Sequence, residues 1–329
     1  MSKRSLCLGV MGQDGSILAE QLLERGDDVY GLYKRVSSGN NFANIAAVKD
    51  HPRLHLIEGD ILDAGFITAL IKDVQPNECY SLAAQSHVGL SFKIPAETIR
   101  LDAEAIAIQL DAIKNFSPKT RFYFAATSEM FGGLNCPEKG FDESSPFYPR
   151  SPYACAKACA FYLVRNYREA YGLFACSGIL MNHSSEKGRR GMDFATRKIT
   201  HGVASVKLGL QKHVQMGDLS AFRDEGAAED YTQAMQLMLA QEKPEDFVVA
   251  TGTGATIEQM FKHVCGLAGL KFEDVYRQDE RFMRPSEVKY LLGNSAKIRA
   301  RGWEPKHDWK SLLTAMYEHD LAELKKEQA

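Results

Sequence analysis

The sequence predicts a doubly wound α/β fold, in which helices cover both faces of a parallel sheet and a smaller α/β lobe follows toward the C-terminus. Two observations predict it. Short apolar runs alternate with amphipathic segments through the first two-thirds of the 329 residues, which is the pattern of βαβ units. Beyond about residue 182 this alternation weakens, and the length suffices for one large unit with an appended lobe.

The individual elements follow from the periodicity of apolar residues. Strands are expected at 6–10, 28–33, 54–58, 78–82, 121–126 and 174–180, with helices in the gaps. The first helix is expected from Ser16 to Arg25, with Ile17, Leu18, Leu22 and Leu23 on one stripe. Gly26 then stands where a C-cap glycine is typical.

Composition and charge exclude several classes of function. Hydrophobic residues make up 45% and charged residues 25%, and no apolar run is long enough to span a bilayer. The formal net charge of −2 gives no global positive field for a nucleic acid or an anionic membrane. The first residues lack the apolar stretch of a signal peptide. We therefore expect a cytoplasmic protein without membrane or nucleic-acid partners.

Cysteine usage fits the same expectation. The seven cysteines are scattered at 7, 79, 136, 155, 159, 176 and 265, without a Cys-x-x-Cys pair or the spacing of a zinc site. Reduced thiols and no bound metal are expected. Cys155 and Cys159 are four residues apart on a predicted helix, and we expect both to be small residues that face the core.

A glycine turn joins the first predicted strand to the first predicted helix. Gly9, Gly12 and Gly15 form a Gly-x-x-Gly-x-x-Gly pattern, which lets the backbone approach a pyrophosphate at a helix N-terminus. The alternative is a tight turn that uses glycine only for its conformational freedom. The context of strand and helix favours the first interpretation, a Rossmann-like dinucleotide site.

The end of the second strand indicates which dinucleotide binds. NAD sites carry an acidic residue there for the ribose hydroxyls, whereas this chain has Lys34, Arg35, Ser37 and Ser38, which suit a 2′-phosphate. NADP is therefore favoured over NAD, and a solvated basic pair is the alternative. After the third strand, Asp60 is a candidate acceptor for the adenine amino group, although such aspartates often cap helices.

A tyrosine and a lysine stand one helical turn apart. Tyr153 and Lys157 fall on the same face of a predicted helix. A phenol titrates near ~10 in water, and an adjacent cation makes the phenolate accessible nearer neutral pH. Tyr153 is thus a candidate general base for a sugar hydroxyl. Such pairs also occur by chance on helix surfaces, but together with the glycine turn this one predicts hydride transfer.

Four further segments carry a resemblance to a known family. They are Thr127-Ser128-Glu129 after the fifth strand, Pro149-Arg-Ser-Pro-Tyr153, Asn182-His183 and Thr196-Arg-Lys-Ile. Together they resemble GDP-mannose 4,6-dehydratases, which are extended short-chain dehydrogenase/reductases, over nearly the whole chain. Related epimerases and reductases generally lack the glutamate, and dTDP-glucose dehydratases usually show Asp-Glu in place of Ser128-Glu129.

The resemblance implies a role for each matching residue. Thr127 should hydrogen-bond the sugar O4 while Tyr153 removes its proton, Glu129 should take the C5 proton, and Lys157 should also hold the nicotinamide ribose. For the cofactor it implies Gly9, Gly12, Gln13, Asp14, Gly15, Arg35, Asp60, Ile61, Ala84, Ser86, Lys157 and His183. For the GDP-sugar it implies Ser86, Ser128, Asn182, Lys198, Arg223, Arg284 and Glu287.

The resemblance also implies an organisation and an assembly. Residues 1–181 should form the NADP-binding domain, to which some later segments return, and residues 182–329 should form mainly the substrate-binding lobe. Residues 34–40 resemble a family loop that crosses to the cofactor of a neighbouring subunit. A homodimer or homotetramer is therefore expected.

The sequence departs from the family pattern in the substrate lobe. The segment from His183 to Gly191 is two residues longer than the usual His-Glu-Ser-Pro-Arg-Arg-Gly. Glu225, Ala227 and Glu229 replace the usual aromatic, histidine and lysine. In addition, Ala195 stands for the usual valine and Phe131 for the usual tyrosine. A longer loop and a smaller side chain could accommodate a larger sugar, such as a GDP-heptose.

The expected reaction is conversion of GDP-mannose, or a closely related GDP-sugar, to the GDP-4-keto-6-deoxy sugar. One alternative is a dehydratase acting on a GDP-heptose. Another is a nucleotide-sugar 4-epimerase or ketoreductase, which would not need Glu129. A non-catalytic subunit that binds a nucleotide sugar is the remaining alternative. The sequence leaves open the donor of the proton to the departing hydroxyl, because Glu129 could act twice.

Overall fold

The structure is a computed structural model that describes residues 2–35 and 42–328. The chain divides into two compact units, each assembled from separated segments. The first unit comprises Met1–Met130, Pro149–Leu180 and Thr232–Phe247, and the second comprises Phe131–Tyr148, Met181–Tyr231 and Val248–Ala329. Ser37 and Ser38, which the sequence assigns to a 2′-phosphate, lie outside the described residues, as does most of the loop 34–40.

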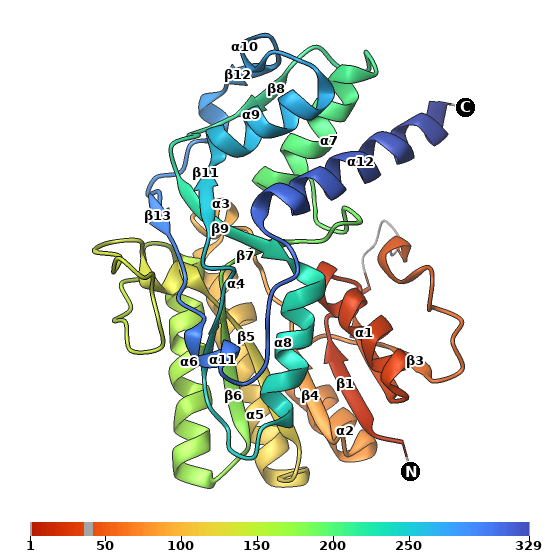
Figure 1. Cartoon of the computed structure of the whole chain (residues 1–329). Helices are drawn as coiled ribbons and strands as arrows, with labels where there is room; N and C mark the ends of the chain where they lie inside the picture. The colour runs from red at the N-terminus through yellow and green to blue at the C-terminus, as the bar shows by residue number, and fades with distance from the viewer. Residues whose placement is uncertain (1, 36–41, 329) are drawn as a thin grey trace. The chain divides into compact units, whose positions relative to one another are not determined.

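The strands of the first unit belong to a seven-stranded sheet (Figure 1). Its order is β10-β6-β5-β4-β1-β2-β3, and the strands from β1 to β6 pair in parallel. All six strands predicted from the sequence are present, each with bounds within two residues of the prediction. The strands are β1 (Arg4–Leu8), β2 (Asp28–Tyr33), β3 (Leu54–Glu58), β4 (Glu78–Ser81), β5 (Arg121–Thr127), β6 (Ala175–Leu180) and β10 (Phe247–Val249).

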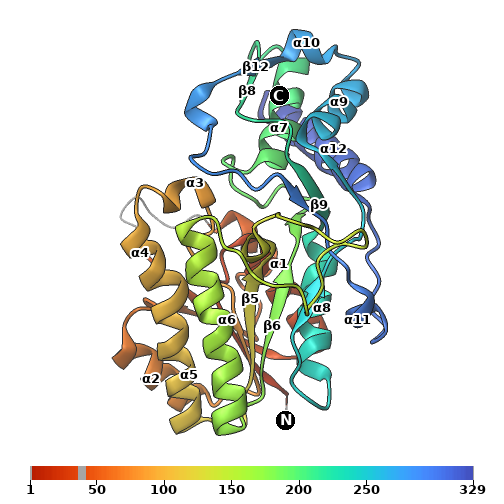
Figure 2. The ribbon, with the colours of Figure 1, turned by 90° about the vertical axis from the view of Figure 1, so that its left-hand side faces the viewer.

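Helices cover both faces of this sheet, as the sequence predicts. Helix α5 (Ala105–Phe116) packs between α2 (Ala64–Val74) and α6 (Pro152–Tyr171). Figure 2 shows α5 and α6 on one side of strands β5 and β6, and α8 (Ala228–Ala240) on the other. A hydrogen bond from Gln236 to Gln21 links α8 to α1 (Gln13–Arg25). Shorter elements are η1 (Ala43–Ile45), α3 (Val88–Ser91), α4 (Pro95–Ile99), η2 (Arg100–Glu104) and η3 (Ser128–Phe131).

The first helix follows the predicted pattern but begins earlier. It begins at Gln13 rather than Ser16, because Gly12 is its N-cap and the glycine turn leads straight into the first helical turn. The predicted apolar stripe is buried. The predicted C-cap is confirmed, since Gly26 adopts a left-handed φ of 99° and its N–H bonds the carbonyls of Leu22 and Leu23.

The prediction for two cysteines on α6 is wrong. Cys155 and Cys159 share one face, but both are exposed. The buried face of α6 instead carries Tyr153, Lys157 and Phe161, which recur at helical spacing and fix which side meets the sheet. Small size alone does not decide burial when larger residues set the helical phase.

The second unit is a small sheet covered by three helices. Strand β9 (Phe222–Ala227) pairs with β7 (Asn182–Ser184), β11 (Gly254–Thr256) and β13 (Tyr290–Leu291). The longer helices are α7 (Ala195–Lys207), α9 (Ile257–Ala268) and α12 (Trp309–Gln328). The remaining elements are β8 (Val214–Met216), α10 (Phe272–Val275), β12 (Tyr276–Gln278), η4 (Glu280–Phe282) and α11 (Ala296–Arg299).

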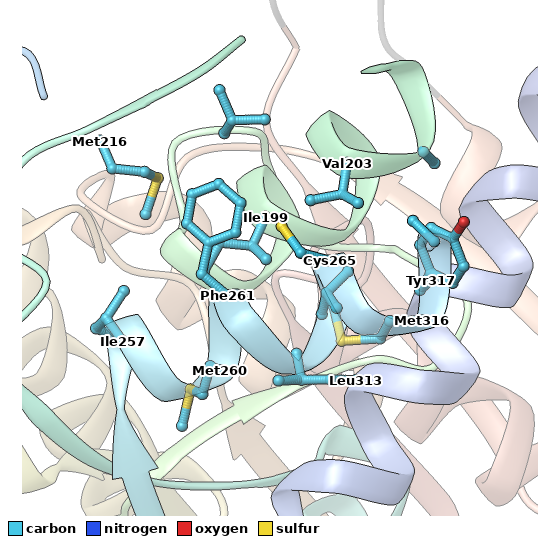
Figure 3. Packing of buried hydrophobic residues seen from close by; sticks show 14 of the residues in the cluster. Ile199, Val203, Met216, Ile257, Met260, Phe261, Cys265, Leu313, Met316 and Tyr317 are labelled. Carbon is cyan, nitrogen blue, oxygen red and sulfur yellow. The ribbon is translucent and has the colours of Figure 1, made fainter. Parts of the chain in front are cut away.

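An apolar cluster holds the three longer helices of the second unit together (Figure 3). Phe261 and Cys265 of α9 lie among Ile199 and Val203 of α7 and Met316 of α12, and all five are buried. Burial of this apolar surface stabilises the unit, by roughly 1.5–3 kcal/mol for each large side chain. Within residues 2–35 and 42–328, no helix is both long enough and apolar enough to cross a membrane.

Candidate active site

The carboxyl end of β5 presents the predicted threonine and glutamate. The strand ends at Thr127, and the short helix η3 begins at Ser128. The backbone N–H of Glu129 donates to the Thr127 hydroxyl oxygen at 3.3 Å. Glu129 is only 8% exposed, which argues against the alternative of a solvated surface carboxylate. A hydroxyl that accepts a hydrogen bond in this way keeps its own proton available as a donor.

Helix α6 brings the tyrosine and the lysine to the same strand. Ser151 caps the helix by accepting from the N–H of Ala154 at 3.1 Å, and Pro152 occupies its first position. Tyr153 and Lys157 are both buried. The Lys157 Nζ donates to the carbonyl of Ala125 at 3.0 Å, two residues before Thr127 on β5. All four predicted catalytic residues therefore belong to the first unit, on β5, η3 and α6.

Lys157 has an electrostatic neighbour that the sequence analysis missed. Burial lowers the pKa of the Lys157 ammonium, and the charge of Asp102 partly opposes this. Burial also raises the pKa of Asp102 to about 6, which Lys157 partly offsets. Asp102 belongs to no motif. The only sequence signal is an acidic residue between Leu101 and Ala103, in a segment whose neighbours are mostly apolar.

The glycine turn before α1 has two glycines that internal packing requires. Gly9 has a φ of 101°, and a Cβ there would lie 2.8 Å from the Ala83 backbone nitrogen. A Cβ on Gly15 would lie 2.2 Å from the Gly9 carbonyl oxygen. Gly12 differs, because it is exposed and its Cβ would only touch that same oxygen at 3.4 Å. The protein itself therefore leaves room for a side chain at Gly12.

The start of α1 has the features of an anion site. Its N-cap is Gly12, which has no side chain to accept from the amides of the first turn. Such amides, together with the helix dipole, favour a phosphate. Gln13 is buried and donates to Asp14 at 2.9 Å, within the same turn.

The residues beyond β2 and β3 meet around an open pocket. The Lys34 ammonium lies 2.8 Å from a carboxylate oxygen of Asp60, whose other oxygen accepts from the Leu62 N–H. The hydrogen bond from Lys34 is the main cause that lowers the pKa of Asp60. Asp60 does not cap α2, because Asp63 does. The pocket, of about 670 Å³, is lined by Lys34, Asp60, Leu62, Asp63, Ala96, Glu97 and Arg100.

The other predicted cofactor residues of the first unit lie around strand ends. Arg35 follows β2, is exposed, and has its guanidinium 4.0 Å from Glu58. Ile61 is buried. Ala84 and Ser86 follow β4, the former half-buried and the latter exposed. Because the carboxyl ends of parallel strands share one edge of the sheet, these residues lie at the edge where α/β folds bind ligands.

In the second unit, His183 and a group of charged residues occupy β7, β9 and the segment before β13. The His183 Nδ1 lies 2.9 Å from the Met181 carbonyl oxygen, and its ring stacks on Tyr231 with centroids 4.7 Å apart. Arg223 is buried and donates to Glu287 at 2.8 Å, and Arg284 reaches the same oxygen at 3.3 Å.

The last two predicted substrate residues lie on β7 and α7. Asn182 opens β7 and is half-buried. Lys198 places its ammonium 3.1 Å from the centroid of the Phe282 ring, and burial is the main cause that lowers its pKa. Asn182, Lys198 and the Arg223 group thus all lie in the second unit.

Two of the residues that depart from the family pattern, Glu225 and Glu229, each accept a hydrogen bond from a serine. The Ser184 hydroxyl donates to Glu225 at 2.7 Å, and the Ser185 hydroxyl donates to Glu229 at 2.7 Å. Burial raises the pKa of both carboxyls. Arg190 donates to the His183 carbonyl at 3.1 Å. Glu225 and Glu229 thus anchor the first residues of the longer loop.

Comparison with known proteins identifies the family. Residues 6–316 match the family model described as GDP-mannose 4,6 dehydratase. The chain is 43% identical to GDP-mannose 4,6 dehydratase 2 of Arabidopsis thaliana, covering 99% of this chain and 89% of that one. It is 40% identical to a GDP-mannose 4,6-dehydratase of Vibrio cholerae, covering 98% and 94%.

Solved structures share the fold at lower identity. A dTDP-glucose 4,6-dehydratase of Bacillus anthracis, in complex with NAD, superposes with a TM-score of 0.84 at 21% identity, covering 99% of this chain and 98% of that one. A UDP-glucose 4-epimerase of Thermotoga maritima, with UDP-glucose, gives 0.83 at 23%, covering 99% and 100%. The likeness to these structures extends over the whole fold, and the sequence match extends over nearly the whole chain. The chain belongs to the GDP-mannose 4,6-dehydratase family.

Proposed function

We propose that this protein is an NADP-dependent hydro-lyase that converts GDP-mannose to the GDP-4-keto-6-deoxy sugar. The observation that carries the proposal is the buried Glu129 beside Thr127 at the end of β5, the strand that Lys157 of α6 also contacts. Family membership over nearly the whole chain supports the same reaction.

The glycine turn fits a dinucleotide. Packing explains Gly9 and Gly15, but it does not explain the absence of a side chain at Gly12, the N-cap of α1. A pyrophosphate that approaches this backbone closely accounts for that absence. Arg35 and Lys34 are the residues proposed to favour NADP over NAD. When bound, the nicotinamide supplies a hydride acceptor for sugar C4 and a hydride donor for C6.

The side chains of the first unit supply the acid–base chemistry. Tyr153 removes the proton of the O4 hydroxyl, to which Thr127 hydrogen-bonds. The ammonium of Lys157, with its Nζ 5.9 Å from the Tyr153 ring centroid, favours the phenolate form of the base. Glu129 removes the C5 proton, which the neighbouring C4 ketone acidifies, and the C6 hydroxyl takes up one proton and leaves as water. A proton from solvent returns to C5 when hydride is added at C6.

The second unit is proposed to bind the GDP part of the substrate. Arg223, Arg284 and Lys198 provide cationic groups for the diphosphate, while Glu287 and Asn182 are candidates for the ribose or base. Glu287 already holds both guanidinium groups, so it also orients them. The first unit is accordingly proposed as the NADP domain and the second as the substrate domain.

A GDP-heptose is the second candidate substrate. The longer loop after His183 favours this substrate. So do Glu225 and Glu229, which replace the family's usual residues and accept hydrogen bonds from Ser184 and Ser185 of that loop. A homodimer or homotetramer in the cytoplasm completes the proposal, and light scattering after size exclusion measures the assembly.

Incubation with GDP-mannose and catalytic NADP⁺ in heavy water, followed by mass spectrometry, tests the function. A dehydratase should remove water and place one deuterium at C5. A GDP-heptose in a parallel reaction distinguishes the two substrates. The proposal would be overturned if the purified protein converted neither of the two sugar nucleotides.

The variant Glu129→Gln distinguishes a dehydratase from an epimerase. It keeps the size of the side chain but removes the base, so turnover should fall by about 10²–10⁴-fold. Glu138→Gln, an exposed glutamate in the loop after η3, is the matched control. An epimerase or ketoreductase would keep its rate in both variants.

A further inference from the structure

Lys157 is a buried cation whose hydrogen-bond partner is neutral. Its side chain lies 4% exposed, donates to the Ala125 carbonyl at 3.0 Å, and has its Nζ 4.8 Å from the Phe124 ring centroid. A carbonyl and an aromatic face do not offset the desolvation of a full charge, which in proteins is offset by a paired carboxylate or by loss of the proton. The reaction proposed above needs the proton to stay.

Asp102 is a buried carboxylate, and its two oxygens differ in their hydrogen bonding. It is 1% exposed, and one oxygen accepts from the Gln85 N–H at 2.7 Å. Its other oxygen is buried and has no hydrogen-bond partner among the residues that the structure describes. A buried carboxylate with an oxygen in this state is unfavourable, unless a nearby positive charge compensates it.

A local irregularity of the helix turns Asp102 inward. Residues Arg100–Glu104 form a π-helical turn between α4 and α5, which inserts an extra residue and changes the helical phase at that point. Arg100 and Glu104 are exposed and pair with each other at 3.3 Å, whereas Asp102 is buried. The turn packs against α6, the helix that carries Lys157.

Among the described residues, the charge named as acting on Lys157 is that of Asp102, which lies in the turn packed against α6. Tyr153 lies one turn earlier on α6, and the contacts of Lys157 on β5, Phe124 and Ala125, carry no charge. The electrostatic effect is mutual, since each charge moves the pKa of the other toward the ionised form. With its pKa at about 6, Asp102 is largely ionised at neutral pH.

We infer that Asp102 is a positioning residue, the buried counter-charge that keeps Lys157 protonated and at the same time holds the backbone of Gln85. Gln85 stands between Ala84 and Ser86, two of the proposed cofactor contacts. One carboxylate therefore links the proposed catalytic lysine to the loop after β4. The consequence for catalysis rests on the proposed function, whereas the ion pair itself does not.

The charge of Lys157 can be measured without substrate or cofactor. In protein labelled with ¹³C at lysine Cε, the NMR signal that disappears in Lys157→Met is assigned to Lys157 and titrated with pH. Asp102→Asn keeps an acceptor for Gln85 but removes the charge, so the Lys157 midpoint should fall by at least about one pH unit. Glu104→Gln removes an exposed charge from the same turn and should leave the midpoint unchanged.

An unchanged midpoint in Asp102→Asn would overturn the inference. Should that variant not fold, the reverse experiment decides. In protein labelled with ¹³C at aspartate carboxyls, the NMR signal that is lost in Asp102→Glu is assigned to Asp102. The pKa of Asp102 should rise in Lys157→Met, because the positive charge is removed. An unchanged pKa of Asp102 would contradict the ion pair.

The effect on catalysis has its own readout. In Asp102→Asn, the alkaline limb of the kcat/KM profile should move to lower pH along with the Lys157 midpoint. A purely structural role would lower activity equally at every pH. If the wild type converts no sugar nucleotide, the proposed function fails, while the NMR titration still decides the ion pair.

Discussion

At the scale of single residues, burial distinguishes the proposed base from the many glutamates on the surface. Glu129 is 8% exposed at the end of β5, although the preceding residues, Thr127 and Ser128, are polar. A carboxylate enclosed in this way has fewer competing water contacts, and its reactivity depends on the protein groups around it. The sequence could indicate the residue but not its burial.

The glycine turn yields a prediction that separates packing from binding. Gly12→Ala should fold with a stability close to wild type, because its Cβ would meet only the Gly9 carbonyl oxygen at 3.4 Å. Binding of NADP, measured by isothermal titration calorimetry, should nevertheless weaken at least about tenfold, which corresponds to about 1.4 kcal/mol. The extra methyl group would stand where the pyrophosphate is proposed to approach.

Gly15→Ala is the matched variant, in which packing rather than binding should fail. Its Cβ would lie 2.2 Å from the Gly9 carbonyl oxygen, so the turn must distort and thermal unfolding should occur at a lower temperature. Tight NADP binding by Gly12→Ala would show that no phosphate approaches this backbone.

At the scale of elements, strands β1 to β6 were predictable because they are short, mostly apolar runs, whereas β10 of the same sheet was not predicted. The first helix was predictable to its last residue, because Gly26 marks its end. The second unit was harder, since the loop 131–148 and the residues after 248 join it from distant parts of the chain. No local pattern shows which distant segments will pack together.

Two local features were missed for identifiable physical reasons. The phase of α6 follows from Tyr153, Lys157 and Phe161 rather than from the size of Cys155, so the cysteines face outward. The π-helical turn that buries Asp102 has no sequence motif. Both depend on packing against a neighbouring helix or strand, which a single sequence does not display.

A carboxylate on β9 predicts how stability changes with pH. Asp224 accepts hydrogen bonds from Thr251, Gly252 and Gly293, yet burial raises its pKa to about 6. Below about pH 6, Asp224 therefore keeps a proton in the folded state that it has lost in the unfolded chain. The free energy of unfolding that depends on this proton falls as the pH rises toward and past 6. Between pH 5 and 8 the loss from this group should be about 1 kcal/mol.

Denaturant unfolding of Asp224→Asn at pH 5 and pH 8 measures this effect. The variant cannot ionise, so its stability relative to wild type should improve by about 1 kcal/mol from pH 5 to pH 8. Asp50→Asn, at an exposed position, should show no such trend. A constant difference across this range would mean that Asp224 titrates at its ordinary value.

At the scale of the whole molecule, the chain passes between the two units close to the residues proposed for catalysis. Its first exit from the first unit follows Met130, next to Glu129, and its second follows Leu180, two residues before Asn182. The proposed acid–base residues belong to the first unit and the proposed diphosphate ligands to the second. The proposal therefore gives each unit its own task, acid–base chemistry for the first and binding of the substrate diphosphate for the second.

The choice of cofactor makes a prediction for the stability of the whole chain. A ligand that binds only the folded state stabilises it by about 2.7 kcal/mol at 100 times its Kd. If Arg35 binds the 2′-phosphate, NADP should raise the melting temperature by several degrees more than NAD at the same concentration. Differential scanning fluorimetry of the wild type and of Arg35→Ala measures this, and the variant, which keeps Lys34, should lose most of the preference for NADP.

Arg53→Ala is the control, since its guanidinium donates to the backbone carbonyls of Gly26 and Leu23 and has no proposed part in binding. It should melt at a lower temperature but keep the preference for NADP. Arg35 is exposed and its guanidinium lies 4.0 Å from Glu58, so its removal should hardly change the melting temperature without ligand. Equal stabilisation of the wild type by NAD and NADP would contradict the role of Arg35. It would leave the glycine turn as the proposed dinucleotide site, because the pyrophosphate is common to both cofactors.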